Sequence, residues 1–267
     1  MEKQDILNAL KKAKEISQKR NFKQSVDLII NFKGLDLKKP DNQLELFIAL
    51  PFTKGKKIKV CGLVGPELTN ESKNTLDQTI IADEFDIYTK DKKITKKLAR
   101  QFDFFIAQAN IMPKVATVFG RYFGPKGKMP NPKADCVVPP NANLKALYER
   151  LQKTVKVSVK VTPLYQGMVG MEDSNENEVV ENVMTIYNTV INSLPNGTHN
   201  IKNSYLKLTM GKPIKIGEKE SAEVKAGKKR ILKTAKETAK KVVPSSTKEK
   251  VVTKNKKIIE EKEEIKS

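Results

Sequence analysis

The stretch KIKVCGLVG, residues 57–65, marks the point at which the hydrophobic pattern of the chain changes. Its apolar residues are nearly continuous and end in a glycine, which is typical of a strand buried on both faces of a parallel sheet. Further apolar strands then alternate with helical patterns. The expected strands lie at 79–81 and 104–109, and the expected helices at 67–78, 92–101, 111–119 and 143–153. This alternation predicts parallel α/β units in the middle of the chain.

Outside this middle region, the apolar residues follow a period of two. Residues 24–33 and 44–50 alternate in this way, and we expect two neighbouring strands that pair over a helix at 3–19. The alternation returns near the other end of the chain. Strands are expected there at 155–161 and 204–210, and an apolar helix at 177–194. The shared pattern of the two ends indicates that the middle is an inserted domain.

Basic residues exceed acidic ones over the whole chain of 267 residues, with 51 Lys and Arg against 31 Asp and Glu, a formal charge of +20. Residues 218–267 hold 16 basic and 9 acidic residues, so residues 1–217 keep a charge of +13. Such a surface attracts polyanions, and we favour nucleic acid as partner over the alternative that the charge serves solubility. The stretch 218–267 lacks aromatic residues and a periodic core pattern, which predicts a disordered or marginally helical tail.

Catalytic and metal chemistry have few candidates. The only histidine, His199, lies in a polar turn without partners for a triad or a metal site. Cys61 and Cys136 stand alone, and we expect reduced, buried thiols. No apolar run suits a bilayer, and the N-terminus does not resemble a secretory signal. We therefore expect a cytoplasmic protein that is not an enzyme and has no metal, cofactor or membrane partner.

Residues 120–133, GRYFGPKGKMPNPK, are expected to form a loop rich in glycine, proline and lysine. The loop is not a phosphate-binding P-loop, because Tyr122 and Met129 replace the required glycine and hydroxyl residue. It closely resembles the signature of the ribosomal protein L-one family, the protein of the mobile lateral stalk of the large subunit. The matching residues are Gly120, Arg121, Gly124, Pro125, Lys126, Gly127, Lys128, Met129 and Pro130.

Two further stretches resemble the same family in the expected order. They are FKQSVDLIINFKGLD at 22–36 and the triplet Thr209-Met210-Gly211. The segment VPPNANL at 138–144 favours the archaeal branch. The resemblance covers residues 1–217 and implies a two-domain α/β (α+β) fold. An open-faced α/β RNA-binding domain is expected at 1–54 and 152–217 and an inserted Rossmann-like α/β domain at 55–151, with the tail at 218–267.

The resemblance also implies a function. The family binds large-subunit ribosomal RNA, forms the mobile stalk, and assists release of tRNA from the exit site. Many members bind their own mRNA and repress its translation, and we expect a monomer outside the ribosome. Two alternatives stay open. One is a small-molecule- or nucleotide-dependent enzyme that uses the Rossmann-like domain, although Gly62 and Gly65 lack the GxGxxG spacing; the other is a general nucleic-acid scaffold.

The resemblance implies eight RNA-binding residues: Arg20, Phe22, Ser25, Lys160, Lys202, Thr209, Met210 and Gly211. Thr209 can bond to a ribose hydroxyl, and Gly211 lets backbone approach backbone. Phe22 is equally consistent with base stacking and with a core anchor, and Met210 has core packing as its alternative. Two positions depart from the family pattern. Asn21 replaces a basic residue beside Phe22, and Gln166 stands where many bacterial members have histidine.

Overall fold

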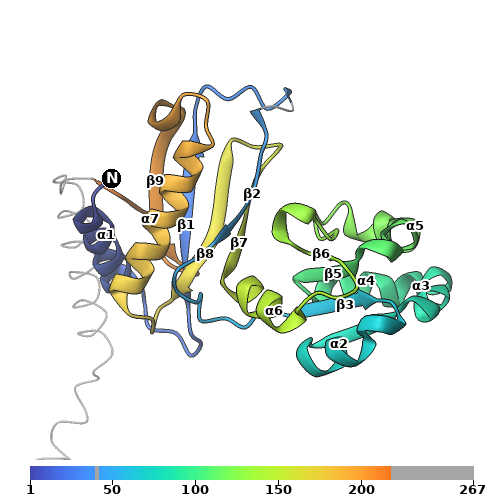
Figure 1. The fold of residues 1–267 in the computed structure, drawn as a ribbon. Helices are drawn as coiled ribbons and strands as arrows, with labels where there is room; N and C mark the ends of the chain where they lie inside the picture. The colour runs from blue at the N-terminus through green and yellow to red at the C-terminus, as the bar shows by residue number, and fades with distance from the viewer. Residues whose placement is uncertain (40–41, 218–267) are drawn as a thin grey trace, which may run out of the picture. The chain divides into compact units, whose positions relative to one another are not determined.

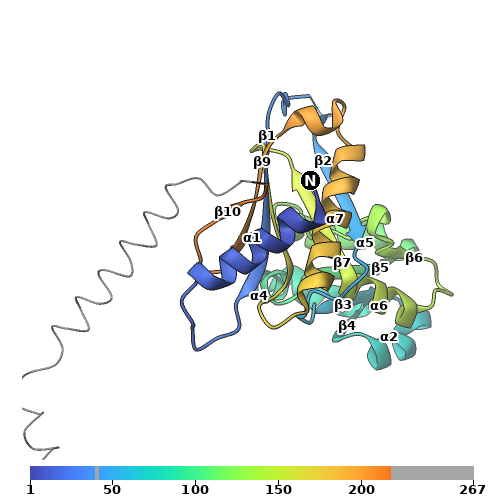
Figure 2. The ribbon, with the colours of Figure 1, turned by 90° about the vertical axis from the view of Figure 1, so that its left-hand side faces the viewer.

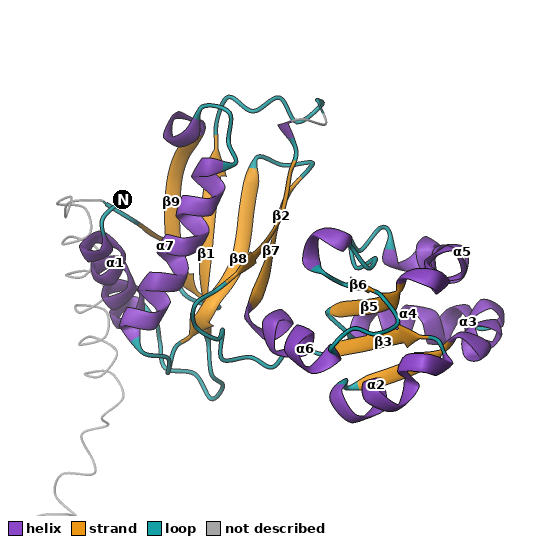
Figure 3. Cartoon of the chain, viewed as in Figure 1, coloured by secondary structure: helices purple, strands orange, loops and turns teal. Residues whose placement is uncertain are grey.

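The structure is a computed structural model that describes residues 1–39 and 42–217. Both ends of this range lie side by side in what we call the terminal half, residues 1–50 and 154–217 (Figures 1 and 3). They share one hydrophobic core. Its elements are α1 (Lys3–Ile16), β1 (Ser25–Phe32), β2 (Leu44–Ala49), β7 (Thr154–Val159), β8 (Leu164–Met171), α7 (Glu176–Asn192), β9 (Ile201–Leu208) and β10 (Ile214–Lys215).

The middle half, residues 58–153, is built of helices around a second sheet (Figure 3) and has two hydrophobic cores of its own. Its elements are β3 (Val60–Val64), α2 (Thr69–Thr75), β4 (Gln78–Ile81), α3 (Phe85–Lys90), α4 (Lys92–Gln101), β5 (Phe104–Gln108), α5 (Met112–Phe123), β6 (Val137–Val138) and α6 (Leu144–Lys153). Short 3-10 helices lie at Pro66–Leu68, Ala82–Glu84, Ala109–Ile111 and Pro132–Ala134, and in the terminal half at Gly197–Asn200.

Strand β1 is central in the antiparallel sheet β10-β9-β1-β8. Its alternating sequence buries Val26, Leu28, Ile30 and Phe32 on one face, as the period of two predicts. Helices α1 and α7 cover this face (Figure 2), because their apolar residues belong to the same core. The opposite face of β1 is only partly buried, and it carries the polar residues of the strand.

Strand β2 pairs with β7 in a separate antiparallel ladder beside β8 (Figure 1). The expectation that 24–33 and 44–50 pair with each other is therefore wrong. Both edges of β1 are occupied, by β8 on one side and β9 on the other, so no edge is left for β2. The partner of β2 is β7, which follows the middle half in the sequence. Leu46 is paired with Val157 in this ladder.

The parallel α/β arrangement expected for the middle half is confirmed. The stretch at 57–65 supplies β3, all five residues of which are buried, in the parallel sheet β4-β3-β5-β6. The expected loop at 120–133 begins too early, because α5 continues to Phe123. Its ring stacks on Phe119 and Phe105, with centroids 5.1 and 4.0 Å away, and this burial extends the helix.

The described residues can be examined for disulfide bonds, metal ligands and membrane-spanning helices. Cys61 and Cys136 are free and buried, as expected, and burial raises the pKa of Cys136 to about 12. Within residues 1–39 and 42–217, no group of three or more His, Cys, Asp or Glu could hold a metal ion. None of the helices in this range is both long and apolar enough to span a membrane. The prediction of a disordered tail concerns residues that lie outside the described range.

The chain leaves and re-enters the terminal half at adjacent residues. Ala49 is paired with Thr154 in the β2–β7 ladder, and the Leu50 amide donates a hydrogen bond to the Lys153 carbonyl over 3.0 Å. Paired residues of an antiparallel ladder have Cα atoms about 4.5–5.5 Å apart. The insertion therefore begins and ends at one point of the terminal half. That the two halves are separate domains stays a prediction.

Candidate nucleic-acid interface

The sheet of the terminal half has one face that no helix of the described chain covers (Figure 2). The strand register arranges its side chains in three rows across β9, β1 and β8. These rows are Lys207–Asp27–Met168, Tyr205–Ile29–Gln166 and Asn203–Asn31–Leu164. Each of these residues is exposed or partly exposed. The surface is wide enough to contact a folded polyanion over several strands.

Ser25 and Thr209 meet at one end of this face, where β1 begins and β9 has just ended. Their hydroxyl oxygens are 2.9 Å apart. The Ser25 amide donates to Thr209 Oγ1 over 2.9 Å, and the Thr209 amide donates to the Ser25 carbonyl over 3.1 Å. Two residues 184 positions apart in the sequence are thereby fixed against each other.

The Ser25 hydroxyl has a second partner, Asp27 Oδ1, at 3.1 Å. When Ser25 donates to this carboxylate, Thr209 donates to Ser25, and both oxygens keep lone pairs that can accept a hydrogen bond. A ribose 2′-hydroxyl is a donor of the required kind. Asp27 was missed by the sequence analysis, although its place in the alternating pattern puts it on the face of Ser25.

Two large apolar side chains lie close to these residues in the sequence, Met210 directly after Thr209 and Phe22 three residues before Ser25. Phe22 is 51% exposed and Met210 is 63% exposed, and neither belongs to a hydrophobic core. The alternatives of a core anchor for Phe22 and of core packing for Met210 are therefore wrong. The Met210 amide donates to the side-chain oxygen of the fully buried Gln24 over 3.4 Å, so the turn after β9 is tied to the loop before β1. No sequence pattern had singled out Gln24.

We call Phe22, Ser25, Thr209, Met210 and Gly211 the strand-end cluster. A Cβ atom added at Gly211 would lie 3.0 Å from Ser17 Oγ and 3.3 Å from Leu208 Cβ. The close approach that Gly211 permits in the structure is therefore to the end of α1 and to β9. Any larger side chain here must displace Ser17, so a substitution of Gly211 tests packing and RNA contact together.

The basic residues expected to support this cluster lie in different places. Arg20 is exposed in the loop before β1, whereas Lys160 follows β7 and Lys202 lies at the start of β9. Phe32, at the far end of β1, pairs with Ile201, so Lys202 lies about 20 Å from Ser25 at 3.3 Å per residue. Lys160 is also at that far end, since Pro163 accepts a hydrogen bond from the Phe32 amide.

Lys160 is in addition held by a carboxylate. Its ammonium lies 2.8 Å from Glu45 Oε2, and that of Lys156 lies 3.0 Å from Glu45 Oε1. The hydrogen bond from Lys160 lowers the pKa of Glu45, with help from Lys156 and against the effect of burial. Part of the positive charge on this strand is therefore neutralised within the protein. An RNA contact of Lys160 stays a prediction.

The signature loop lies away from the strand-end cluster. Gly120 and Arg121 belong to the last turns of α5, and the remaining signature residues follow that helix. Gly127 has a φ of 62°, a conformation that favours glycine, and its carbonyl accepts a hydrogen bond from Lys156 Nζ over 2.6 Å. Lys128 Nζ donates to the Phe102 carbonyl over 2.6 Å. The loop thus joins the middle half to β7 of the terminal half.

The carboxyl edge of the parallel sheet is where a Rossmann-like domain would hold a nucleotide. Here the Gly65 amide donates to Gln108 Oε1 over 2.9 Å, and Gln108 Nε2 donates to Glu67 Oε2 over 2.8 Å. Gln108 is 2% exposed. A buried amide and a carboxylate thus occupy the position that a phosphate needs, which does not support the nucleotide-dependent enzyme.

An antiparallel sheet with one uncovered face, interrupted by a parallel α/β half, is the architecture that the signature loop and the Thr-Met-Gly triplet imply. A sequence model of the family described as "Ribosomal protein L1p/L10e family" matches residues 10–212. The chain therefore belongs to this family.

Relatives of the same family cover most of the chain. It is 42% identical over 216 residues to the large ribosomal subunit protein uL1 of Methanothermococcus thermolithotrophicus, covering 81% of this chain and 99% of that protein. The identity is 39% over 214 residues with uL1 of Methanothermobacter thermautotrophicus, with coverages of 80% and 99%. It is 36% over 225 residues with uL1 of Methanocaldococcus jannaschii, with coverages of 84% and 100%. These archaeal relatives agree with the branch that VPPNANL favoured.

Proposed function

We propose that this protein is a cytoplasmic constituent of the large ribosomal subunit, without enzymatic activity, that binds large-subunit ribosomal RNA through the terminal half. The strand-end cluster carries the proposal. It presents two hydroxyl groups that are 2.9 Å apart and two exposed apolar side chains, and residues 1–217 carry a charge of +13. The names of its relatives as large-subunit proteins support the same conclusion.

The expected mode of recognition follows from the geometry of the cluster. Phe22 can stack on an unpaired base, Met210 can fill an apolar gap, and the hydroxyl groups can bond to a ribose. The basic residues contribute phosphate contacts that depend little on sequence. Specificity then comes from the shape of one folded RNA site that fits the strand-end cluster. This mode of recognition makes a general nucleic-acid scaffold the less favoured alternative.

Family membership supports a more detailed proposal. The protein forms the mobile stalk with its RNA, assists release of tRNA from the exit site, and binds its own mRNA as a translational repressor. It is a monomer outside the ribosome. We expect ribosomal RNA and the mRNA to compete for the uncovered face of β9, β1 and β8.

Sequencing of RNA crosslinked to the protein in its own cells tests the proposal. We expect most reads to map to one region of the large-subunit RNA and a minority to the protein's own mRNA. Reads spread over cellular RNA in proportion to abundance would support the general scaffold instead.

We expect the affinity for the ribosomal RNA site to fall with salt, with a log–log slope of several units. Each neutralised phosphate contributes about 0.7–0.9 to that slope. Deleting residues 218–267, which carry a net +7, should reduce the slope only modestly and leave the preference for this RNA intact. Filter binding at several salt concentrations, with a random duplex as competitor, measures both quantities. A truncated protein that no longer prefers the stalk RNA would contradict the assignment to the terminal half.

We further propose that residues 1–54 and 152–217, which include the terminal half, form a domain into which residues 55–151 are inserted. A chain in which a short Gly/Ser linker joins Pro51 to Lys153 should fold, because Ala49 and Thr154 are already paired. We expect it to keep most of the RNA affinity. Circular dichroism melts and filter binding are the measurements. An unfolded product, or a folded one that ignores the RNA, would reject the division.

A further inference from the structure

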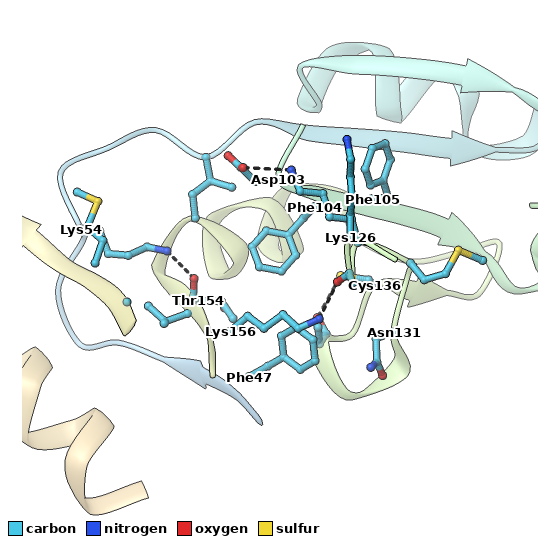
Figure 4. Close-up of a pocket in the computed structure, with 18 of the residues that line it drawn as sticks. Phe47, Lys54, Asp103, Phe104, Phe105, Lys126, Asn131, Cys136, Thr154 and Lys156 are labelled. Carbon is cyan, nitrogen blue, oxygen red and sulfur yellow. Dashed lines mark hydrogen bonds and ion pairs between the residues drawn. The ribbon is translucent and has the colours of Figure 1, made fainter. Parts of the chain in front are cut away.

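A pocket of about 340 Å³ lies between the signature loop and strand β7, outside the strand-end cluster (Figure 4). Six lysines contribute to its walls: Lys54, Lys56, Lys57, Lys126, Lys128 and Lys156. The aromatic rings of Phe47 and Phe104 form part of its apolar surface, with centroids 6.5 Å apart. Its size is that of a site for a small ligand.

The lysines of the pocket outnumber the carboxylates available to them. Carboxylates compensate three of the six. Lys57 pairs with Asp77 at 3.1 Å, Lys128 with Asp103 at 3.7 Å, and Lys156 with Glu45 at 3.0 Å. For Lys54, Lys56 and Lys126, no carboxylate of residues 1–39 and 42–217 lies within 4.0 Å. The pocket therefore holds an excess of about three positive charges.

Among the three lysines that lack a carboxylate partner in the described residues, Lys54 is partly buried, whereas Lys56 and Lys126 are exposed. The Lys54 ammonium donates to the Thr154 carbonyl over 2.7 Å (Figure 4), which uses one of its three protons. Burial lowers the pKa of Lys54 to about 8, against the attraction of Asp103. Removing an ammonium group from water without placing an anion beside it costs free energy. Binding of an anion offsets this cost.

The pocket is also connected with the uncovered face of the sheet. Met168 lines the pocket and is the register partner of Asp27, whose carboxylate is bonded to Ser25. An RNA that contacts the strand-end cluster and crosses two strands, spaced about 4.8 Å apart, therefore comes near the pocket.

From this geometry we propose that the pocket binds a phosphate group, with Lys54 on its inner side and Lys56 and Lys126 at its rim. Two sources supply this chemistry. One is a backbone phosphate of the bound RNA, which rests on the proposed function above; the other is a free phosphate or mononucleotide, for which the rings of Phe47 and Phe104 offer an apolar contact.

Calorimetric titration of the full chain with inorganic phosphate is the first test. We expect saturable binding that Lys54→Gln weakens roughly tenfold or more, the size typical of a hydrogen bond to a charged group. Lys90→Gln, at an exposed lysine on α3 outside the pocket, should leave it unchanged. Saturation that is equally strong in Lys54→Gln and wild type overturns the site.

Proton uptake gives a second readout. At pH 8 a bound phosphate raises the pKa of Lys54, so binding takes up protons, and the measured heat depends on the ionisation enthalpy of the buffer. Lys54→Arg should retain binding but lose this dependence, since a guanidinium stays protonated. Failure of both the Arg and the Gln variant to alter proton uptake counts against Lys54 as a ligand.

Binding to the large-subunit RNA distinguishes the two sources. If the phosphate belongs to the RNA, Lys54→Gln weakens RNA binding and inorganic phosphate competes with RNA. If the ligand is free, RNA affinity is unchanged and phosphate also binds the RNA-bound protein. Wild-type RNA affinity in Lys54→Gln, together with no phosphate binding to wild type, rejects the pocket as a phosphate site. The proposed function would survive that result, because it depends on Thr209 and its neighbours.

Discussion

Thr209→Val weakens binding to the large-subunit RNA by about five- to a hundred-fold, the cost of leaving a buried polar partner unsatisfied. Valine keeps the shape of the side chain and replaces the hydroxyl with a methyl group. Thr209→Ser, the matched control, keeps the hydroxyl near Ser25 Oγ and should bind nearly as well as wild type. Filter binding of both variants to the same RNA measures the difference.

The loss should come from the interface, because Thr209 is exposed in the free protein. Valine removes the acceptor for the Ser25 amide at 2.9 Å, and water can replace it, so the cost in the free energy of unfolding is about 0.5–1.5 kcal/mol. Thermal melts of the variant separate this cost from binding. Unchanged affinity in Thr209→Val would remove the strand-end cluster from the RNA site.

Phe119→Ala destabilises the middle half by about 3–5 kcal/mol, the range for loss of a buried aromatic side chain. Phe119 is fully buried and contacts Phe85 edge-on and Phe123 in a stacked arrangement, with centroids 5.3 and 5.1 Å away. We expect an early thermal transition confined to residues 58–153, followed by the transition of the terminal half. RNA affinity below the first transition should stay close to that of wild type.

Leu28→Ala is the matched substitution in the other core, where Leu28 is fully buried on β1. It should cost about 2–5 kcal/mol and reduce RNA binding, because it loosens the strand that carries Ser25. Hydrogen exchange resolved by residue locates each loss. A single transition that includes both halves in Phe119→Ala, or RNA binding lost with the middle half, would contradict the proposal of two domains.

Regular periodicity predicted most of the elements, and pairing between distant elements was the part that failed. The strands at 24–33 and 44–50 were recognised, but sequential strands are neighbours in only about two-thirds of cases. Strand β8, Leu164–Met171, was missed because Gly167 and Gly170 interrupt its pattern. A Cβ at Gly170 would lie 2.8 Å from Val179 Cγ2, so glycine is required there for α7 to pack on the sheet.

The candidate site residues were predicted from a different kind of information than the helices and strands. Physical patterns predicted a basic polyanion binder, while Phe22, Ser25 and Thr209 were found through resemblance to a family. Exposure of Phe22 and Met210 follows from the turn after β9 and the loop before β1, whose geometry no periodicity determines. The sequence also gives no sign that the pocket lysines lie together, since Lys54 and Lys126 are 72 positions apart in a chain that is rich in lysine.

The interrupted terminal half also has a consequence for biosynthesis. Strand β1 leaves the translating ribosome long before β8 and β9, its partners on both sides, have been made. Between Phe32 and Ile201 lie about 170 codons, which take roughly 10–30 s to translate at 5–20 residues per second. If the middle half is a domain, it folds during that interval, while the apolar residues of α1 and β1 still lack the strands on which they pack. A nascent chain that stops before Gly211 therefore lacks part of the proposed RNA surface, and we expect only a product that extends past Gly211 to enter a new subunit.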